Sequence, residues 1–424
     1  MPTRRPAAPR RLIAALAASL LLVACSPGPT TAPTASSPAE TQAPPVATPG
    51  TSAPPAAEVY GEIRQAVEAI RGLEPVADVD PVTIDEAQLR SNLAAEFDKE
   101  NKPADVKFSE ESLSLLGLLP AGTSLRQATL DFQGGQVAGY YSPDQKELFV
   151  VSRSGSLGAA EKVTYAHEFT HQLQDQNFPL LGLLGSDASQ SDRTLARLAV
   201  IEGDAVSVQT AWTIANLNAR EMGELLAASL DPEAVDALRR APAYLRETAL
   251  FPYQNGFSFV ESLISSGGYK AVNGALGDAP DSTEQVLHPE KFVQREPPVQ
   301  VALAGDVAKT MGIGWSEAGR DTLGEFVLRL WLTQNGVPTD IATAAATGWG
   351  GDRLVLLRGP SGGLTVGLRT EWDTAADAAA FASASATAIA HLGSGAATRH
   401  RAGSKTVILA IGDGADRLVP ALGG

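Results

Sequence analysis

The sequence holds a single cysteine, Cys25, among its 424 residues. One cysteine can form neither an intramolecular disulfide nor a thiolate metal site, so an exported fold would have to be stabilised by its hydrophobic core. Basic residues are also few: 33 lysines and arginines stand against 48 aspartates and glutamates, which gives a formal charge of −15. Such an acidic chain argues against nucleic acid or an anionic lipid surface as the partner.

Several familiar signatures are absent as well. The sequence contains no Walker loop, no dinucleotide fingerprint, no G-x-S-x-G nucleophile elbow and no internal repeat. Beyond residue 24, no hydrophobic run reaches the roughly 20 residues that a membrane-spanning helix needs. Whatever chemistry the chain carries must therefore come from another arrangement of side chains.

The N-terminus reads as an export signal. Four arginines within residues 4–11 precede the apolar run 12–24, and a charged segment followed by a short apolar run is typical of a signal peptide. The sequence LVAC, which ends at Cys25, resembles the bacterial lipoprotein cleavage site. This resemblance implies that Cys25 is acylated and becomes the first mature residue. Removing residues 1–24 with their four arginines takes the formal charge from −15 to −19.

Residues 25–57 form a low-complexity segment. After the cysteine they consist almost wholly of Pro, Thr, Ala, Ser and Gly, a composition that cannot bury a core. In polyproline form, at about 3.1 Å per residue, the segment could hold the folded body up to roughly 100 Å from the membrane. We therefore interpret it as a disordered tether and expect function from residue 58 onward.

The motif HEFTH at residues 167–171 points directly to chemistry. No Pro or Gly lies between residues 161 and 178, so a helix is expected there. On a helix, His167 and His171 lie one turn apart on the same face and can bind one tetrahedral zinc ion. Glu168 falls beside them and can act as general base for a metal-activated water. The alternative is a surface helix with two solvated histidines; the placement of two of only five histidines at ligand spacing favours one zinc ion per chain.

A third ligand is needed, and five acids lie within reach in the sequence: Asp175, Asp187, Asp192, Glu202 and Asp204. Glu202 lies on an apolar stripe of a predicted helix, where a carboxylate is costly unless it is paired, and zinc would pair it. The alternative for Glu202 is a core salt bridge with an arginine. Gly203 beside it would allow close approach of another backbone or of the metal. Asp204 either fixes the tautomer of a ligating histidine or has an ordinary structural role.

A second polar cluster lies between residues 242 and 292. Ser282 and Gln285 form a predicted capping box, and His288 follows at the end of that short helix. Zinc peptidases stabilise the developing oxyanion with a Tyr, His or Arg donor, so His288 and Tyr253 are predicted catalytic residues, with Tyr269 as a further candidate. The alternative for His288 is a cap or a donor within the core.

Hydrophobic periodicity predicts the remaining elements. Expected helices cover residues 59–71, 84–100, 109–118, 192–216, 321–335 and 374–391. Expected strands cover residues 128–132, 135–141, 147–151, 354–357, 364–372 and 406–411, with a turn at 142–146. Trp349 and Trp372 are expected to pack in the core.

HEFTH followed by EGDA resembles the gluzincin metallopeptidases. More closely, AHEFTHQLQDQNF, IEGDA, FPYQNGFSFV, STEQVLHPEKF, TLGEF and GWGGD are similar to a largely uncharacterised group of bacterial exported proteins, over roughly residues 129–375. By position, the resemblance implies that His167, His171 and Glu202 bind zinc and that Glu168 is the catalytic base.

These observations predict an α+β fold with a zincin-like catalytic core, in which a small sheet accompanies the HExxH helix and the helix that carries Glu202. Predicted boundaries are a signal peptide at 1–24, the tether at 25–57, a helical N-terminal subdomain at 58–127, the core at 128–295 and a small C-terminal subdomain of helices and strands at 296–424.

The predicted function is that of an extracytoplasmic, lipid-anchored zinc metallohydrolase. Its expected substrate is a peptide or protein of the cell envelope, and its expected membrane contact is the acylated Cys25. The alternative is a cell-surface binding or scaffold lipoprotein that keeps the fold without turnover, and a third hypothesis is hydrolysis of a non-peptide bond. No oligomeric state follows from the sequence.

Overall fold

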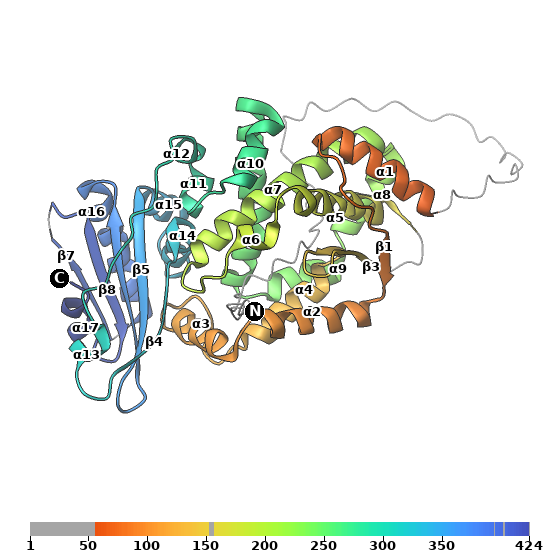
Figure 1. Ribbon diagram of the computed structural model, residues 1–424. Coiled ribbons are helices and arrows are strands. Elements are labelled where there is room, and N and C mark those ends of the chain that lie inside the picture. The colour runs from red at the N-terminus through yellow and green to blue at the C-terminus, as the bar shows by residue number, and fades with distance from the viewer. Residues whose placement is uncertain (1–55, 152–156, 394, 402, 424) are drawn as a thin grey trace, which may run out of the picture.

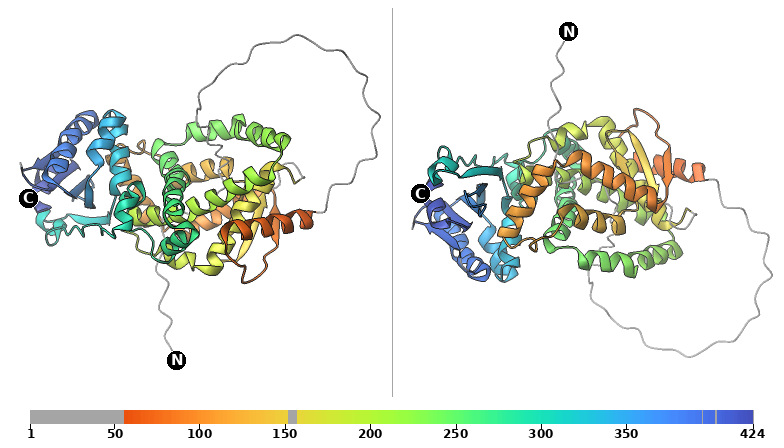
Figure 2. Two further views of the ribbon diagram at one scale, coloured as in Figure 1. Left: turned by 90° about the horizontal axis from the view of Figure 1, so that it is seen from above. Right: turned by 90° about the horizontal axis from the view of Figure 1, so that it is seen from below.

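The computed structural model describes residues 56–151, 157–393, 395–401 and 403–423. In Figures 1 and 2, most helices gather in one part of the molecule, and a larger sheet with its own covering helices forms the other. The predicted α+β class is confirmed. The predicted signal peptide, Cys25 and nearly all of the tether lie outside the described residues and stay predictions. None of the described helices is both long and apolar enough to cross a bilayer.

The helical part contains a small sheet. Its elements are α1 (Ala56–Arg71), β1 (Pro81–Ile84), α2 (Glu86–Glu100), α3 (Pro103–Leu115), α4 (Leu125–Gln136), β2 (Gly139–Ser142), β3 (Glu147–Val151), α5 (Ala159–Asn177), α6 (Leu180–Leu184), α7 (Ser191–Asn216), α8 (Ala219–Ser229), α9 (Pro232–Arg240) and α10 (Ala243–Gly277).

The larger sheet and its helices follow. The elements are α11 (Thr283–Leu287), α12 (Pro289–Val293), α13 (Val307–Met311), β4 (Ser316–Asp321), α14 (Gly324–Gln334), α15 (Thr339–Ala346), β5 (Trp349–Arg358), β6 (Leu364–Trp372), α16 (Ala375–Leu392), β7 (Ala396–His400), β8 (Thr406–Gly412) and α17 (Ala415–Ala421).

The small sheet has the order β1-β3-β2, with β1 parallel and β2 antiparallel to β3. β2 lies against α5. A Cβ atom on Gly139 would come within 2.7 Å of the Thr164 side chain and 2.8 Å of the Phe149 carbonyl oxygen, so only glycine permits this approach. The same Cβ would lie 3.5 Å from Glu168, which places the backbone of β2 beside the HExxH motif.

Four expectations for the first half differ from the structure. The expected strand at 128–132 belongs to α4, because Ser124 caps a helix there by accepting a hydrogen bond from the Gln127 backbone amide. β1 was missed, and the expected strand at 135–141 shrinks to β2. The helix expected at 109–118 begins earlier, at Pro103, which occupies the first turn of α3, where its missing N–H costs nothing.

α7 and α10 cross with their backbones in contact. A Cβ on Gly203 would lie 2.2 Å from the Gly256 carbonyl oxygen, and one on Gly256 would lie 2.1 Å from the Ala199 carbonyl oxygen. The expectation that Gly203 admits a second backbone is therefore confirmed. α10 bends at Gly268, where φ is 62°.

The larger sheet is antiparallel, with the order β4-β5-β6-β8-β7. Alternate side chains of β5 enter two different clusters: Leu354 and Leu356 join the core that includes Trp331 and Phe381, whereas Val355 and Leu357 pack with α17. The sheet is thus covered on both faces. The expected strands at 354–357, 364–372 and 406–411 and the helix at 374–391 are confirmed, while β4 and β7 were missed.

The largest cluster of buried apolar residues runs through both parts of the molecule, from Phe108 through Val260 to Leu409. Trp349 and Trp372 belong to it, as predicted. The helical part and the larger sheet therefore share a hydrophobic core. The predicted subdomain boundaries at 127/128 and 295/296 stay predictions.

Candidate metal centre

Two buried helices position the HExxH motif and its partner. α5 begins after Gly158, whose backbone amide donates a hydrogen bond to Glu161, and it is buried from Val163 to Asp175. α7 packs against it and is buried over most of its length. Both helices were expected from the sequence, and their contact brings residues 35 positions apart onto facing surfaces.

The side chains of His167, His171 and Glu202 converge. The two histidine Nε2 atoms are 3.0 Å apart, and a Glu202 carboxylate oxygen lies 3.3 Å and 3.4 Å from them. Metal bonds of about 2.0–2.1 Å in a tetrahedron would separate the ligand atoms by about 3.3–3.4 Å. All three residues are buried, and the group could hold a metal ion.

The donor set and the local charge fit a divalent ion with an affinity for nitrogen. Two imidazoles and one carboxylate suit zinc and its neighbours, whereas magnesium and calcium prefer oxygen ligands. Glu202 and Glu168 are both fully buried carboxylates. The nearby cation Arg71 is paired with Asp204, so the salt bridge between Glu202 and an arginine is not formed. A divalent cation would balance the two glutamates.

The titration of the three ligands reflects their proximity. Burial disfavours a charged imidazole, but attraction to Glu202 outweighs this and raises the pKa of His171 to about 9. Burial, together with the adjacent His171, lowers the pKa of His167. Burial alone would raise the pKa of Glu202, yet the charge of His171 and hydrogen bonds from both histidines lower it. In the metal-free protein the proton on His171 thus supplies positive charge beside Glu202, and a metal ion must displace this proton when it binds.

Glu168 and Tyr253 border this group. Glu168 is fully buried, and its charge contributes to the raised pKa of His171. The Tyr253 ring is nearly parallel to the His167 ring, at 21° and 6.2 Å between centroids. Tyr253 packs with Leu250 and Leu238.

A cavity of about 680 Å³ lies one helical turn from Glu168. Thr164, four residues before Glu168 on α5, forms part of its wall, as does Ala138 just before β2. Leu238 and Leu250 line the cavity and pack in one apolar cluster with Tyr253, the ring that stacks on His167.

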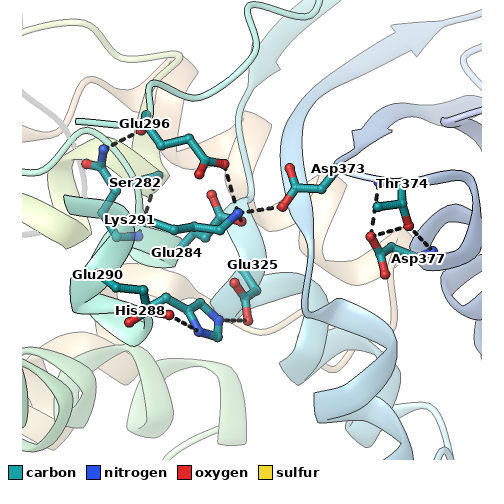
Figure 3. A network of polar contacts seen from close by, with 11 residues as sticks. Ser282, Glu284, His288, Glu290, Lys291, Glu296, Glu325, Asp373, Thr374 and Asp377 are labelled. Carbon is teal, nitrogen blue, oxygen red and sulfur yellow. Dashed lines mark hydrogen bonds and ion pairs between the residues drawn. The ribbon is translucent and has the colours of Figure 1, made fainter. Parts of the chain in front are cut away.

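The structure places His288 in a different network, shown in Figure 3. Its Nε2 atom is 3.0 Å from Glu325 and its Nδ1 atom 3.9 Å from Glu290. Neither nitrogen contacts the metal group, and we assign no catalytic role to His288. Tyr269 is also elsewhere, with its ring 4.7 Å from the Arg71 guanidinium.

The predicted capping box near His288 forms only in part. The Ser282 side chain accepts from the Gln285 amide at 3.3 Å, but the Gln285 side chain accepts from the amide of Asp281 instead of Ser282.

Of the five acids considered as third ligand, Glu202 alone joins the group. Asp175 pairs with Lys146 and Tyr141. Asp192 is the second residue of α7, buried, and accepts hydrogen bonds from Thr283. Asp187 caps a turn at Ser189. Asp204 reaches His171 only through Gln174, so it does not contact a ligating histidine directly.

Two residues around the site were missed. Gln174 lies three residues after His171 on α5 and contacts its ring, a spacing that could have been recognised in the sequence. Arg71 contacts Asp204 across 133 residues of chain, and no local pattern indicates that contact.

Comparison with known proteins adds little about this centre. A domain of unknown function, DUF8575, matches residues 310–418, which include the larger sheet and none of the metal-group residues. No curated protein matches the sequence. A protein from Chloroflexus aurantiacus, crystallised as "a putative hydrolase with a novel fold", is 16% identical, with 56% of this chain and 88% of that chain covered and a TM-score of 0.36. A TM-score this low supports no conclusion about fold or function.

Proposed function

We propose that this protein is a zinc-dependent metallohydrolase that cleaves peptide bonds, and that acylated Cys25 anchors it outside the cytoplasm. The observation that carries the enzymatic proposal is the convergence of His167, His171 and Glu202 with Glu168 beside them. The resemblance of HEFTH and EGDA to the gluzincins supports the same chemistry. A purely structural metal site would need the three ligands but not the adjacent glutamate.

Each side chain has a distinct task in this proposal. His167, His171 and Glu202 would hold the zinc ion, which when bound lowers the pKa of a water molecule and polarises a carbonyl group. Glu168 takes the proton of the water that attacks the peptide carbonyl carbon. As the carbon–nitrogen bond breaks, Glu168 returns that proton to the departing amine. Tyr253, stacked beside His167, is the candidate hydrogen-bond donor to the developing oxyanion.

The cavity beside Thr164 offers a route for the substrate. It borders the helix turn that precedes Glu168 and the backbone that leads into β2. In this proposal a peptide reaches the buried ligands from this side, past Leu238 and Leu250. β2 is an edge strand of its sheet, so its backbone is a candidate for pairing with an extended substrate.

A peptide-library digest tests the enzymatic proposal. The mature protein should cleave library peptides, and a chelator should abolish cleavage. Glu168→Gln should keep the zinc ion but lower turnover by about 10²–10⁴-fold, because the general base is lost. Glu325→Gln is the matched control: it changes another buried glutamate beside a histidine and should leave turnover unchanged. Equal turnover by Glu168→Gln would refute the assignment of the base.

Other outcomes separate the alternatives. Stoichiometric zinc with no peptide cleaved would exclude the peptidase and favour a binding lipoprotein or hydrolysis of another bond. Purified protein without affinity for zinc would overturn the proposal as a whole.

Anchoring is tested separately with a labelled fatty acid in a bacterial host. The wild-type chain should incorporate the label and partition with membranes, whereas Cys25→Ala should do neither. Label retained by the variant would show that Cys25 is not the acylated residue.

A further inference from the structure

We infer that Gln174, Asp204 and Arg71 are positioning residues that hold His171 in the tautomer required for metal binding. The inference rests on the metal site of the proposed function and deepens it. Its starting point is that the three side chains form one continuous buried chain of contacts behind His171.

The first link fixes the orientation of Gln174. Its side-chain nitrogen lies 2.9 Å from the Ile201 carbonyl oxygen and 2.8 Å from an Asp204 carboxylate oxygen, and both partners only accept hydrogen bonds. The nitrogen must therefore face them. The Gln174 oxygen is then turned to His171 Nδ1, at 2.8 Å. This oxygen requires a proton on Nδ1, so Nε2 is the nitrogen that is left to bind the metal.

The second link holds the Asp204 carboxylate in place. The Arg71 Nε atom lies 2.8 Å and 2.9 Å from its two oxygens, and both side chains are fully buried. The hydrogen bonds described for this carboxylate come from Arg71 and Gln174. Without the guanidinium, Gln174 alone would hold the Asp204 carboxylate in this position.

The third link anchors Arg71. Its guanidinium donates to the Asn273 side chain at 2.7 Å and lies 4.7 Å from the centre of the Tyr269 ring, both on α10. Arg71 itself is the last residue of α1. The orientation of His171 on α5 thus depends on a charge supplied by α1, a helix of the predicted N-terminal subdomain.

Loss of Arg71 has a specific consequence in this arrangement. Gln174 would then be oriented by the Ile201 carbonyl oxygen without a fixed carboxylate beside it, so its contact with His171 Nδ1 would be held less firmly. His171 would spend less time in the orientation that presents Nε2 to the metal. The expected effect is weaker zinc binding, in addition to any loss of stability.

The test is the dissociation constant for zinc, measured by competition with a chromophoric chelator well below the melting temperature. Arg71→Met should weaken binding by about 10–100-fold, the range found when partners of ligating histidines are removed. Arg71→Lys keeps the charge and should lose less. Arg197→Met is the control, because Arg197 also forms an ion pair on α7, with Asp281, away from the metal group.

A double variant separates positioning from packing. Arg71→Met with Asp204→Leu removes both buried charges, so stability should recover relative to Arg71→Met alone. Zinc binding should stay weak, because Gln174 lacks its charged partner. Recovery of stability and zinc affinity together would overturn the inference, as would wild-type affinity in Arg71→Met. If the wild-type chain binds no zinc, the proposed function fails together with the inference. If the wild type binds zinc and the variants bind it equally well, the inference fails but the proposed function stands.

Discussion

Two clusters of histidine and glutamate, one buried and one partly exposed, differ in where their positive charge comes from. We call the polar network of Figure 3 the junction network. In it, His288 contacts Glu325, and the Lys291 nitrogen lies 2.7 Å from Glu284, 3.0 Å from Glu296 and 2.5 Å from Asp373. The chain itself supplies the cations there.

In the metal group, the contacts of the Glu202 carboxylate are the two histidines, and the nearby arginine is already paired with Asp204. The same residue types therefore build a self-contained ion-pair network at one place and, at another, a group that could hold an external cation. The presence of histidine and glutamate does not decide between them. Two other features decide: the direction in which the lone pairs of these residues point, and whether a lysine or arginine is available nearby.

The sharpest test of this difference is loss of one histidine from each cluster. His171→Ala should lower the zinc content from one ion per chain to none, because two remaining protein ligands seldom hold zinc. His288→Ala should keep the full zinc content. Metal analysis of the purified proteins measures both, and stoichiometric zinc in His171→Ala would show that the ligand assignment is wrong.

A second test concerns the backbone contact that places Glu202. Gly203→Ala should destabilise the protein by about 3 kcal/mol or more, because the new Cβ would overlap the Gly256 carbonyl group of α10. Gly274→Ala in α10 is the control, since a Cβ there meets no atom within 4 Å, and it should be neutral or stabilise by up to about 1 kcal/mol. Urea denaturation measures both, and equal stability of the two variants would contradict the crossing.

A third test compares the response of the clusters to zinc. At free zinc 100-fold above its dissociation constant, the folded state should gain about 2.7 kcal/mol relative to the apoprotein. Glu325→Gln in the junction should retain this gain, whereas Glu202→Gln should lose most of it. Thermal unfolding with and without zinc measures the gain, and an equal response from the two variants would remove the distinction between the clusters.

The smallest expected effect is a pH dependence of the junction. Burial raises the pKa of Glu284 to about 7, and the hydrogen bond to Glu325 raises the pKa of His288. Both shifts mean that the folded state binds more protons than the unfolded chain. The contribution of Glu284 to the free energy of unfolding is therefore fully present below pH of about 4.5 and is lost as pH rises through 7.

Glu284→Gln removes the titration of that carboxyl. The melting temperature of the metal-free variant should therefore fall less between pH 4.5 and 7.5 than that of the wild type, by a difference of about 2–4 °C per kcal/mol of lost linkage. Glu317→Gln on the surface is the control. An equal change of melting temperature with pH in the wild type and in Glu284→Gln would contradict the raised pKa of Glu284.

Local patterns predicted the elements whose signals do not depend on distant contacts. The HExxH helix was expected because no helix breaker interrupts it, and β6 and β8 because their apolar residues suit a sheet covered on both sides. The periodicity of residues 128–132 favours a strand because α4 has few apolar residues, and the Ser124 N-cap is the local signal that indicates a helix. β1 and β7 were missed because each is short and lies at a sheet edge, where few apolar residues are needed.

For the site, the spacing of His167 and His171 determined that both imidazoles share one face of a helix, since that follows from helix geometry alone. The apolar surroundings of Glu202 indicated a buried carboxylate in need of a cation. Only the tertiary structure decided that His288 lies in another network and that Arg71 reaches the metal centre through Asp204 and Gln174. Those contacts join residues far apart in the chain, and they form only when helices pack, a step that no local sequence pattern encodes.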